Sequence, residues 1–280
     1  MNYKISVHIT YYQGSRENLK RNFFLKKVIL SYLSISKNIE IFIHSNKKYP
    51  YKHKSVKCIM HNLKVEHPFY LSWKCRNLIF KQRNSYDYFI YSEDDILFTI
   101  KNFLYWKKYN SLCLKNNYNL GFVRVEDRKS KGLYAVDIFK KLRQFISLQG
   151  RQFIINDNNP YCALWIMPKV ELNNFVKSDT WKFKWKMRYQ CYGDIRAMSA
   201  IGWHAKNMEH YKSTIIPVKG SKIDTGSIIV HLDNKYSITR HGPGSLRFNN
   251  LLEKNLVKIS NYDNYKLLIK KYLKNIFNAL

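Results

Sequence analysis

The first 120 residues alternate between strand-like and helix-like hydrophobic periods, and this alternation leaves few folds open to the chain. Runs with a period of two residues, rich in β-branched and aromatic side chains, indicate strands, and a period near 3.6 indicates helices. The strand-like runs span residues 3–11, 39–44, 56–60 and 86–92, and the helix-like segments span 18–33, 70–83 and 100–114. This order predicts parallel strands joined by helices, with ligands bound beyond the carboxyl ends of the strands.

The pattern is less regular after residue 120. Strand candidates span residues 120–125, 153–155, 161–167 and 228–232, a helix-like segment follows Gly193, and residues 262–277 read as a basic amphipathic helix. The sequence contains no internal repeat and no Pro/Ser-rich linker. We therefore predict a single α/β domain over residues 1–280, in which 1–125 and 126–260 form two halves and 261–280 form the C-terminal helix.

Composition narrows the class of partner. The chain has 280 residues, 45% of them hydrophobic, which is enough to bury a core. Its formal net charge of +30 attracts anions, whether nucleic acid, the phosphates of a small substrate or an anionic membrane face. The five cysteines are isolated, and no signal-peptide core or run of eighteen apolar residues occurs. We expect a cytoplasmic protein without a membrane-spanning helix.

Negative charge gathers at one predicted strand end, in the stretch YDYFIYSEDDILF at residues 86–98. Asp87, Glu93, Asp94 and Asp95 are four of the nineteen acidic residues of the chain. Three consecutive carboxylates repel one another unless a cation lies among them, and a divalent cation with oxygen ligands meets that need. Strand alternation would place Glu93 and Asp95 on one side and Asp94 on the other. The alternative is a solvated acidic turn that ends the strand.

The alternating first half and this acidic stretch together resemble the nucleotide-sugar-binding half of glycosyltransferases of the GT-A fold, in which a DxD-type motif follows a strand. The resemblance implies a Rossmann-like GT-A fold with a central, mainly parallel sheet. By that resemblance Asp95 would bind Mn²⁺ or Mg²⁺, and Glu93 or Asp94 would contact the ribose or the waters of the metal. The implied reaction moves a sugar from a nucleotide-diphosphate sugar, UDP-linked by expectation, to a hydroxyl of a glycan or lipid-linked acceptor.

Three further residues would contact the donor by the same resemblance. Arg76, in HPFYLSWKCR, would lie on a helix beside the nucleotide, although an ordinary exposed helix residue fits the pattern too. Tyr11 ends the first strand, where an aromatic ring can stack on the base; a plain core or surface tyrosine fits equally. Arg240, in ITRHGPGS, would belong to a loop that folds over the diphosphate, and a simple surface turn would look the same.

By the same resemblance, two residues of the second half of the chain would take part in the sugar transfer. Asp194, in YGDIRAMSAIG, would be the general base that accepts the proton of the acceptor hydroxyl, although aspartate is also a preferred helix cap. His231 ends an apolar strand and would be an additional metal ligand, or a hydrogen-bonded histidine without metal. The chain lacks the HxxGxxKPW-like signature of some retaining GT-A enzymes, which favours inversion.

Two other classes compete with a transferase of cell-surface polysaccharide or lipopolysaccharide assembly. A metal-dependent nuclease or nucleotidyltransferase would use the basic surface, 22 tyrosines and 16 phenylalanines to bind nucleic acid. Against it, the sequence has no zinc finger and no run of five Lys or Arg, so we expect no nucleic-acid partner. A membrane-surface module would use the basic C-terminal helix. We favour a transferase that lies peripherally on the anionic inner face of the cell membrane.

Overall fold

The structure, a computed structural model, describes residues 3–14, 19–63, 66–157, 159–178, 180–182, 195–201, 212–237 and 246–260. The predicted C-terminal helix, 261–280, lies outside these residues. Contacts divide the chain into two compact units, each built from three segments. Unit 1 comprises Met1–Phe103, Tyr161–Trp203 and His231–Asp233, and unit 2 comprises Leu104–Pro160, His204–Val230 and Asn234–Leu280. The sequence pattern suggested two halves that meet at residue 125; the observed units interleave along the chain instead.

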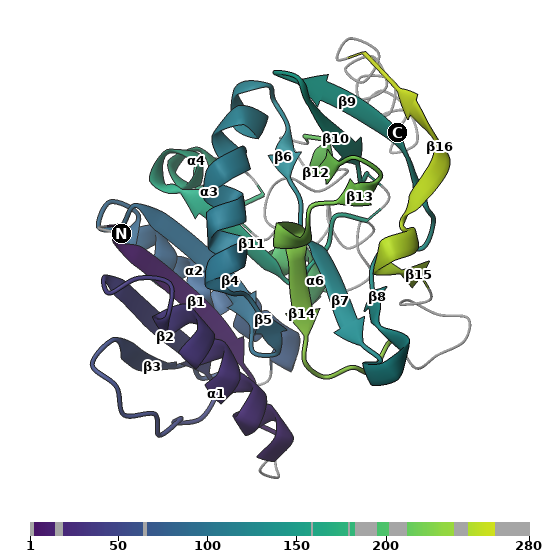
Figure 1. Cartoon of the computed structure of the whole chain (residues 1–280). Coiled ribbons are helices and arrows are strands. Elements are labelled where there is room, and N and C mark those ends of the chain that lie inside the picture. Colours follow the sequence, from purple (N-terminus) through teal and green to yellow (C-terminus); the bar gives the residue numbers. More distant parts are fainter. Residues whose placement is uncertain are drawn as a thin grey trace, which may run out of the picture. The chain divides into compact units, whose positions relative to one another are not determined.

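Helices and strands of unit 1 appear in Figure 1. They are β1 (Ile5–Tyr11), α1 (Leu19–Leu33), β2 (Ile39–Ser45), β3 (Val56–Met60), the 3-10 turn η1 (Pro68–Tyr70), α2 (Leu71–Gln82), β4 (Tyr88–Glu93), β5 (Ile96–Leu97), β11 (Leu164–Pro168), α4 (Lys169–Phe175) and α6 (Ile195–Ile201). Each element predicted in the first 100 residues is confirmed, with ends that differ by two residues or fewer. The reason is that strand and helix periods are both strong there.

The sheet of unit 1 has the strand order β11-β4-β1-β2-β3. Strands β4, β1, β2 and β3 run parallel, and β11 pairs with β4 in the antiparallel direction. The chain proceeds from β1 outward through β2 to β3 and then returns to place β4 on the other side of β1. The carboxyl ends of β1 and β4 therefore lie side by side at the point where the strand order reverses, which is where open α/β sheets bind ligands.

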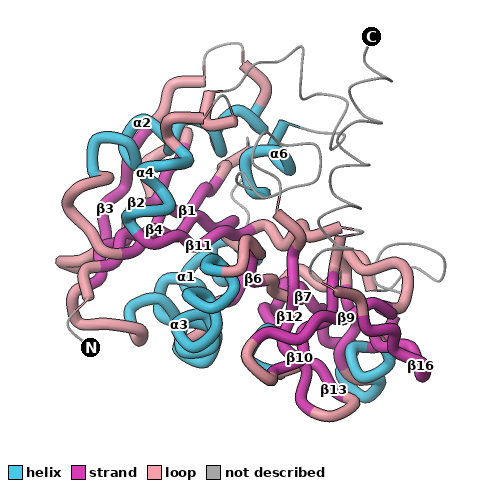
Figure 2. Tube along the Cα trace, turned by 90° about the horizontal axis from the view of Figure 1, so that it is seen from above, coloured by secondary structure: helices cyan, strands magenta, loops and turns pink. Residues whose placement is uncertain are grey.

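Helices cover both faces of this sheet, α1 on one face and α2 with α4 on the other (Figure 2). Every residue of β1 is buried, as expected for a parallel strand covered on both sides. Because side chains alternate, Val7, Ile9 and Tyr11 face α1, whereas His8 and Thr10 face α2.

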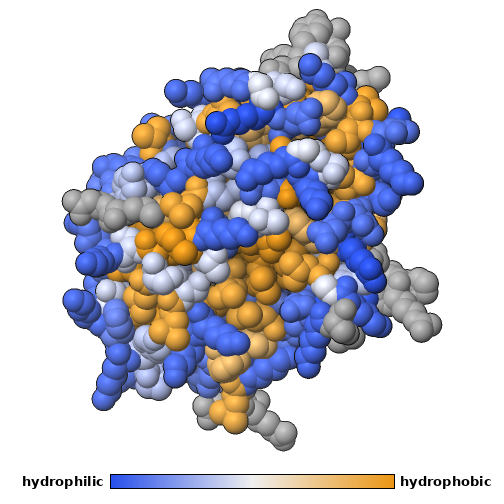
Figure 3. All heavy atoms as spheres, viewed as in Figure 1, coloured by the Kyte–Doolittle hydropathy of each residue, from blue (hydrophilic) through white to orange (hydrophobic). Residues whose placement is uncertain are grey.

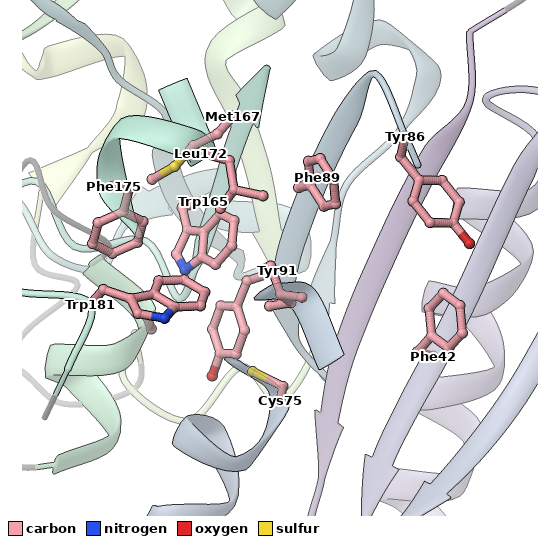
Figure 4. Packing of buried hydrophobic residues seen from close by; sticks show 12 residues of the cluster. Phe42, Cys75, Tyr86, Phe89, Tyr91, Trp165, Met167, Leu172, Phe175 and Trp181 are labelled. Carbon is pink, nitrogen blue, oxygen red and sulfur yellow. The ribbon is translucent and has the colours of Figure 1, made fainter. Parts of the chain in front are cut away.

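An aromatic core fills the α2 side of the sheet (Figure 4). The ring of Trp165 on β11 stacks on that of Tyr91 on β4, with centroids 5.8 Å apart. Phe175 and Trp181 meet edge to face at 5.2 Å. The buried members of this core are Phe42, Cys75, Ile79, Tyr86, Phe89, Tyr91, Trp165, Met167, Leu172, Phe175, Trp181 and Ala200. It fixes β11 and α4 against the strand that carries the acidic residues.

A row of three histidines crosses the same face of the sheet. His8 Nδ1 lies 3.0 Å from His44 Nε2, and His44 Nδ1 lies 2.8 Å from His61 Nε2. Ser6 Oγ donates to Gln82 Oε1 at 3.2 Å and contacts His8 Nε2 at 2.8 Å. The serine oxygen therefore accepts from His8 Nε2, His8 Nδ1 accepts from His44 Nε2, and His44 Nδ1 accepts from His61 Nε2. This arrangement requires that the rings of His8 and His44 are neutral.

The energetic consequence is a set of histidines that resist protonation. Burial lowers the pKa of His8 to about 3. Burial, and then the neighbouring imidazoles, lower the pKa of His44 well below its ordinary value. Burial and, second, the charge of Lys74 lower the pKa of the half-buried His61. A proton added to His8 or His44 would set two donors against each other, so the folded state excludes it.

Unit 2 is built mainly of β-sheet. Its strands are β6 (Asn119–Leu120), β7 (Val123–Asp127), β8 (Leu133–Ala135), β9 (Leu142–Leu148), β10 (Arg151–Ile155), β12 (Thr214–Lys219), β13 (Lys222–Ile223), β15 (Leu246–Arg247) and β16 (Leu252–Lys258). Helix α3 (Ile100–Lys115) and strand β14 (Ile228–His231) have residues in both units, and 3-10 turns span Lys129–Lys131, Thr225–Ser227 and Phe248–Asn250. The predicted strands at 120–125, 153–155 and 228–232 correspond to described strands, whereas β9, β12 and β16 were not predicted.

One sheet of unit 2 has the order β13-β12-β10-β9-β16, and another contains β15-β8-β7-β14. Antiparallel pairs join β9, β10, β12 and β13, while β16 pairs with β9 and β14 pairs with β7 in parallel. The α/β class is thus confirmed, and the sheets are mixed, with the parallel arrangement concentrated in unit 1. None of the helices in the described part of the chain has both the length and the apolar character needed to cross a bilayer.

Candidate functional site

A pocket opens at the carboxyl edge of the unit 1 sheet, where β1 and β4 end. Its cavity volume is about 110 Å³, and it is open to solvent. The lining residues come from the ends of β1 and β4 and from α1, η1, α2 and α6: Thr10, Tyr12, Arg21, Pro68, Phe69, Leu71, Ser72, Glu93, Asp94 and Arg196. The pocket therefore lies at the reversal point of the strand order and combines apolar, aromatic and charged groups.

The acidic cluster, defined as Glu93, Asp94 and Asp95, divides between two environments. Glu93 is the last residue of β4, and a turn begins at Asp94. The turn ends strand alternation, so Glu93 and Asp94 both line the pocket, and Asp95 instead approaches His231. We expected Glu93 and Asp95 to share one side; the turn is the reason that they do not. All three side chains are buried or nearly so, which contradicts a simple solvated turn.

Arg21 on α1 holds the central carboxylate. Its Nε donates to Asp94 Oδ2 at 2.9 Å, and its Nη2 donates to Asp94 Oδ1, a bidentate pair. Burial raises the pKa of Asp94 to about 7; Arg21 opposes the shift, and the charges of Asp95 and Glu93 add to it. Burial alone would lower the pKa of Arg21, but the Asp94 carboxylate more than offsets this and raises it. Since 38% of the Arg21 side chain is exposed, this cation also forms part of the pocket wall.

A second cation, Arg196 on α6, approaches the first carboxylate. Its Nε lies 3.9 Å from Glu93 Oε1, and its guanidinium lies over the ring of Phe69, 4.9 Å from the centroid. The hydroxyl of Tyr161 donates to the same Glu93 oxygen at 3.0 Å. The pocket therefore has two guanidinium groups, Arg21 at Asp94 and Arg196 near Glu93, and an aromatic side chain, Phe69, in its wall.

The carboxylate of Asp95 faces residues from the late part of the chain. His231 Nε2 lies 3.3 Å from Asp95 Oδ2, and the backbone N–H of Leu232 donates to Asp95 O at 2.9 Å. Lys20 on α1 pairs with Asp233 at 2.6 Å. Three consecutive residues of this returning segment thus contact unit 1. The structure brings Asp95 and His231 together, as expected for ligands of one cation, while the role itself stays a prediction.

The donor set at Asp95 and His231 fits a divalent cation in part. A carboxylate and an imidazole suit Mn²⁺, and Mg²⁺ is held in many sites by one or two carboxylates plus substrate phosphates. Within the described residues, no group of three or more His, Cys, Asp or Glu side chains is arranged to hold a metal ion. At this position the described residues thus offer two protein donors, one carboxylate and one imidazole.

Tyr11 does not reach the pocket. Its side chain is buried on the α1 side, where the hydroxyl donates to Asn22 and the ring meets Tyr49 edge to face with centroids 5.5 Å apart. Alternation along β1 sends the next residue to the other side, so Tyr12, 38% exposed, lines the pocket. The aromatic ring that is placed to stack on a ligand is thus one position later than expected.

Arg76 also lies away from the pocket wall. The side chain is buried under α2, and Nη1 donates to the carbonyls of Thr180 and Trp181 at 2.9 and 2.6 Å. Its guanidinium stacks on the ring of Trp73 at 4.0 Å, and the Trp73 indole donates to the carbonyl of Ile195, the first residue of α6. Arg76 therefore supports the backbone around the helix that carries Arg196. It is not the exposed residue that the sequence allowed.

The other predicted residues, Asp194 and Arg240, lie outside the described residues. Two charged residues that line the pocket, Arg21 and Arg196, were not predicted. Arg196 is two positions from Asp194, in the segment YGDIRAMSAIG that the sequence already assigns to the site. The segment could therefore be predicted from sequence, although the residue was not. Arg21 is one of several basic residues on α1, and nothing in the local sequence distinguishes it. Comparison with known proteins assigns no family, because no family model and no curated protein matches the chain.

Proposed function

We propose that this chain is a metal-dependent glycosyltransferase of the GT-A type that uses a nucleotide-diphosphate sugar as donor. We expect the nucleotide of this donor to be UDP. One observation carries the proposal: a solvent-open pocket at the point where the strand order reverses is lined by two carboxylates, those of Glu93 and Asp94. The GT-A architecture itself is part of the proposal, since the described fold is a mixed α/β arrangement. The acceptor is a hydroxyl of a glycan or of a lipid-linked acceptor in cell-surface polysaccharide or lipopolysaccharide assembly.

The pocket residues divide the work of donor binding. Arg21 and Arg196 present guanidinium groups that pair with the anionic diphosphate, and Tyr12 and Phe69 offer ring faces for the base. Asp95 and His231 would hold Mn²⁺ or Mg²⁺. When bound, the cation would offset the charge that develops on the leaving diphosphate. Asp194 stays the candidate base for an inverting attack by the acceptor hydroxyl.

Binding of the donor tests this function directly. We expect UDP or a UDP-sugar to bind in the presence of Mn²⁺ in a calorimetric titration, and EDTA to abolish the signal. Asp95→Asn keeps the shape of the side chain and removes its charge, so it should weaken metal-dependent binding by at least about tenfold. Asp87→Asn is the matched control, because Asp87 lies at the opposite end of the same acidic stretch and caps the Lys4 N–H.

The result that contradicts the proposal is equally specific. If no nucleotide-sugar binds, while oligonucleotides bind with strong salt dependence and are cleaved or extended with Mn²⁺, the pocket belongs to a nuclease or nucleotidyltransferase. Equal effects of Asp95→Asn and Asp87→Asn would remove Asp95 from the metal site.

Arg196 provides a second test that does not involve the cation. Arg196→Met should weaken donor binding roughly tenfold or more, since a hydrogen bond to a charged group contributes about 1.5–3 kcal/mol. Arg83→Met is the control, because Arg83 also stacks on a phenylalanine ring, with its guanidinium 3.9 Å from the Phe80 centroid, but lies at the surface end of α2. Unchanged donor affinity in Arg196→Met would show that Arg196 only supports Glu93.

A further inference from the structure

The outward face of α1 carries an apolar stripe, defined as Leu19, Phe23 and Leu30. These side chains are 73%, 55% and 52% exposed. Their spacing of four and seven residues places them on one side of the helix. The opposite side of α1 is already buried against the sheet through Phe24, Leu25, Val28, Ile29 and Tyr32. The stripe is therefore not needed to hold the helix on the protein.

Cations surround this stripe. Lys26 and Lys27 are exposed, Lys20 is exposed but pairs with Asp233, and α1 contains no acidic residue. The Lys27 ammonium lies 4.4 Å from the centroid of the Phe23 ring, so its aliphatic stem covers part of the apolar surface while the charge stays in water. Apolar side chains rimmed by lysines complement a surface that is hydrophobic below and anionic at its boundary.

Other exposed apolar side chains of the described residues are spread over separate elements. Val170 lies on α4, Leu104 on α3 and Met60 at the end of β3. Isolated residues of this kind are ordinary on protein surfaces. In the view of Figure 3, hydrophobic side chains gather over α1, between hydrophilic ones. The stripe is thus distinguished by its alignment along one helix and by its lysine rim.

We propose that the α1 stripe docks on the surface of an anionic lipid bilayer, with Leu19, Phe23 and Leu30 at the boundary between headgroups and acyl chains and the lysines at the lipid phosphates. Arg21, on the same helix, lines the pocket. Arg21 lies on the side of α1 opposite the stripe, so docking would leave the pocket about one helix diameter, ~10 Å, from the bilayer. A lipid-linked acceptor would be held at that bilayer; this last clause rests on the proposed function.

Vesicle flotation at physiological ionic strength tests the docking surface. The probes are phosphatidylcholine vesicles with and without phosphatidylglycerol, and the variant is Phe23→Ser/Leu30→Ser, which alters no charge. We expect the wild type to float with the anionic vesicles. The variant should bind them at least roughly tenfold more weakly, a change that corresponds to about 1.4 kcal/mol of lost apolar burial. The control, Leu104→Ser/Val170→Ser, removes two other exposed apolar side chains and should bind like the wild type.

The outcomes separate three explanations. If Phe23→Ser/Leu30→Ser binds anionic vesicles as tightly as the wild type, the attraction comes only from the net charge of +30 and the inference is overturned. The wild-type protein could instead form dimers and bind no vesicles, while the variant stays monomeric. That outcome would assign the stripe to contact with a second copy of the chain, and it would also overturn the inference. The titration with nucleotide-sugar donors is carried out on the same two proteins. If the variant loses vesicle binding and neither protein binds a nucleotide-sugar, the membrane-docking inference stands and the proposed function is rejected.

Discussion

Replacing Arg21 by methionine is expected to lower the free energy of unfolding by about 2–3 kcal/mol near neutral pH, measured by denaturant titration. The substitution leaves the Asp94 carboxylate without its bidentate partner in a site where only 2% of that side chain is exposed. The loss is smaller than for a fully buried pair, because water reaches part of Arg21. Methionine keeps most of the apolar stem, so the change isolates the charge.

The double variant Arg21→Met/Asp94→Asn distinguishes charge from packing. It removes the unpaired carboxylate, and stability should return toward that of the wild type. Arg21 lowers the pKa of Asp94, so its loss makes folded Arg21→Met bind a proton at a higher pH than the folded wild type does. The deficit should therefore be largest at alkaline pH, shrink as the pH falls toward about 7 and change little below that. An equal loss in the single and double variants, independent of pH, would mean that Arg21 acts through its stem.

Acid should destabilise unit 1 through the histidine row, defined as His8, His44 and His61. The unfolded chain takes up a proton at each histidine near pH 6.5, whereas His8 in the folded chain does so only near pH 3. Stability from His8 and His44 is therefore complete above pH 6.5 and is lost as the pH falls. Each of these two buried residues contributes a slope of about 1.4 kcal/mol per pH unit over that window.

The slope, not the absolute stability, is the quantity to compare between variants. His8→Asn should reduce the dependence of the unfolding free energy on pH by about 1.4 kcal/mol per unit between pH 4 and 6. Asp94, with its raised pKa, contributes in the opposite direction in both proteins, so the difference isolates the histidine. His53→Asn replaces an exposed histidine and serves as the control. Parallel slopes for wild type and His8→Asn would show that the row admits protons.

The sequence predicted the unit 1 sheet well because its strands are buried on both faces and its helices have a clear apolar side. Strands such as β9, with the sequence LRQFISL, have no strict alternation and escaped prediction. The site was predicted in part. His231 ends an apolar strand and Asp95 follows one by two residues, a signal that local sequence carries. The pairing of Arg21 with Asp94, 73 positions apart, depends on how helix α1 returns across the sheet, which local pattern does not determine.

Unit 1 is completed by a segment of three residues, His231–Asp233, whose chain neighbours on both sides belong to unit 2. A ribosome that has made the first 203 residues has synthesised every lining residue of the pocket but not the imidazole beside Asp95. Asp95, just after β4, thus gains its contact with His231 only after the later part of the chain has been synthesised. A fragment cut at residue 125, where the sequence pattern loosens, would also lack β11 and α6. Dissection of this protein by truncation would therefore remove parts of the site along with the unit it was meant to separate.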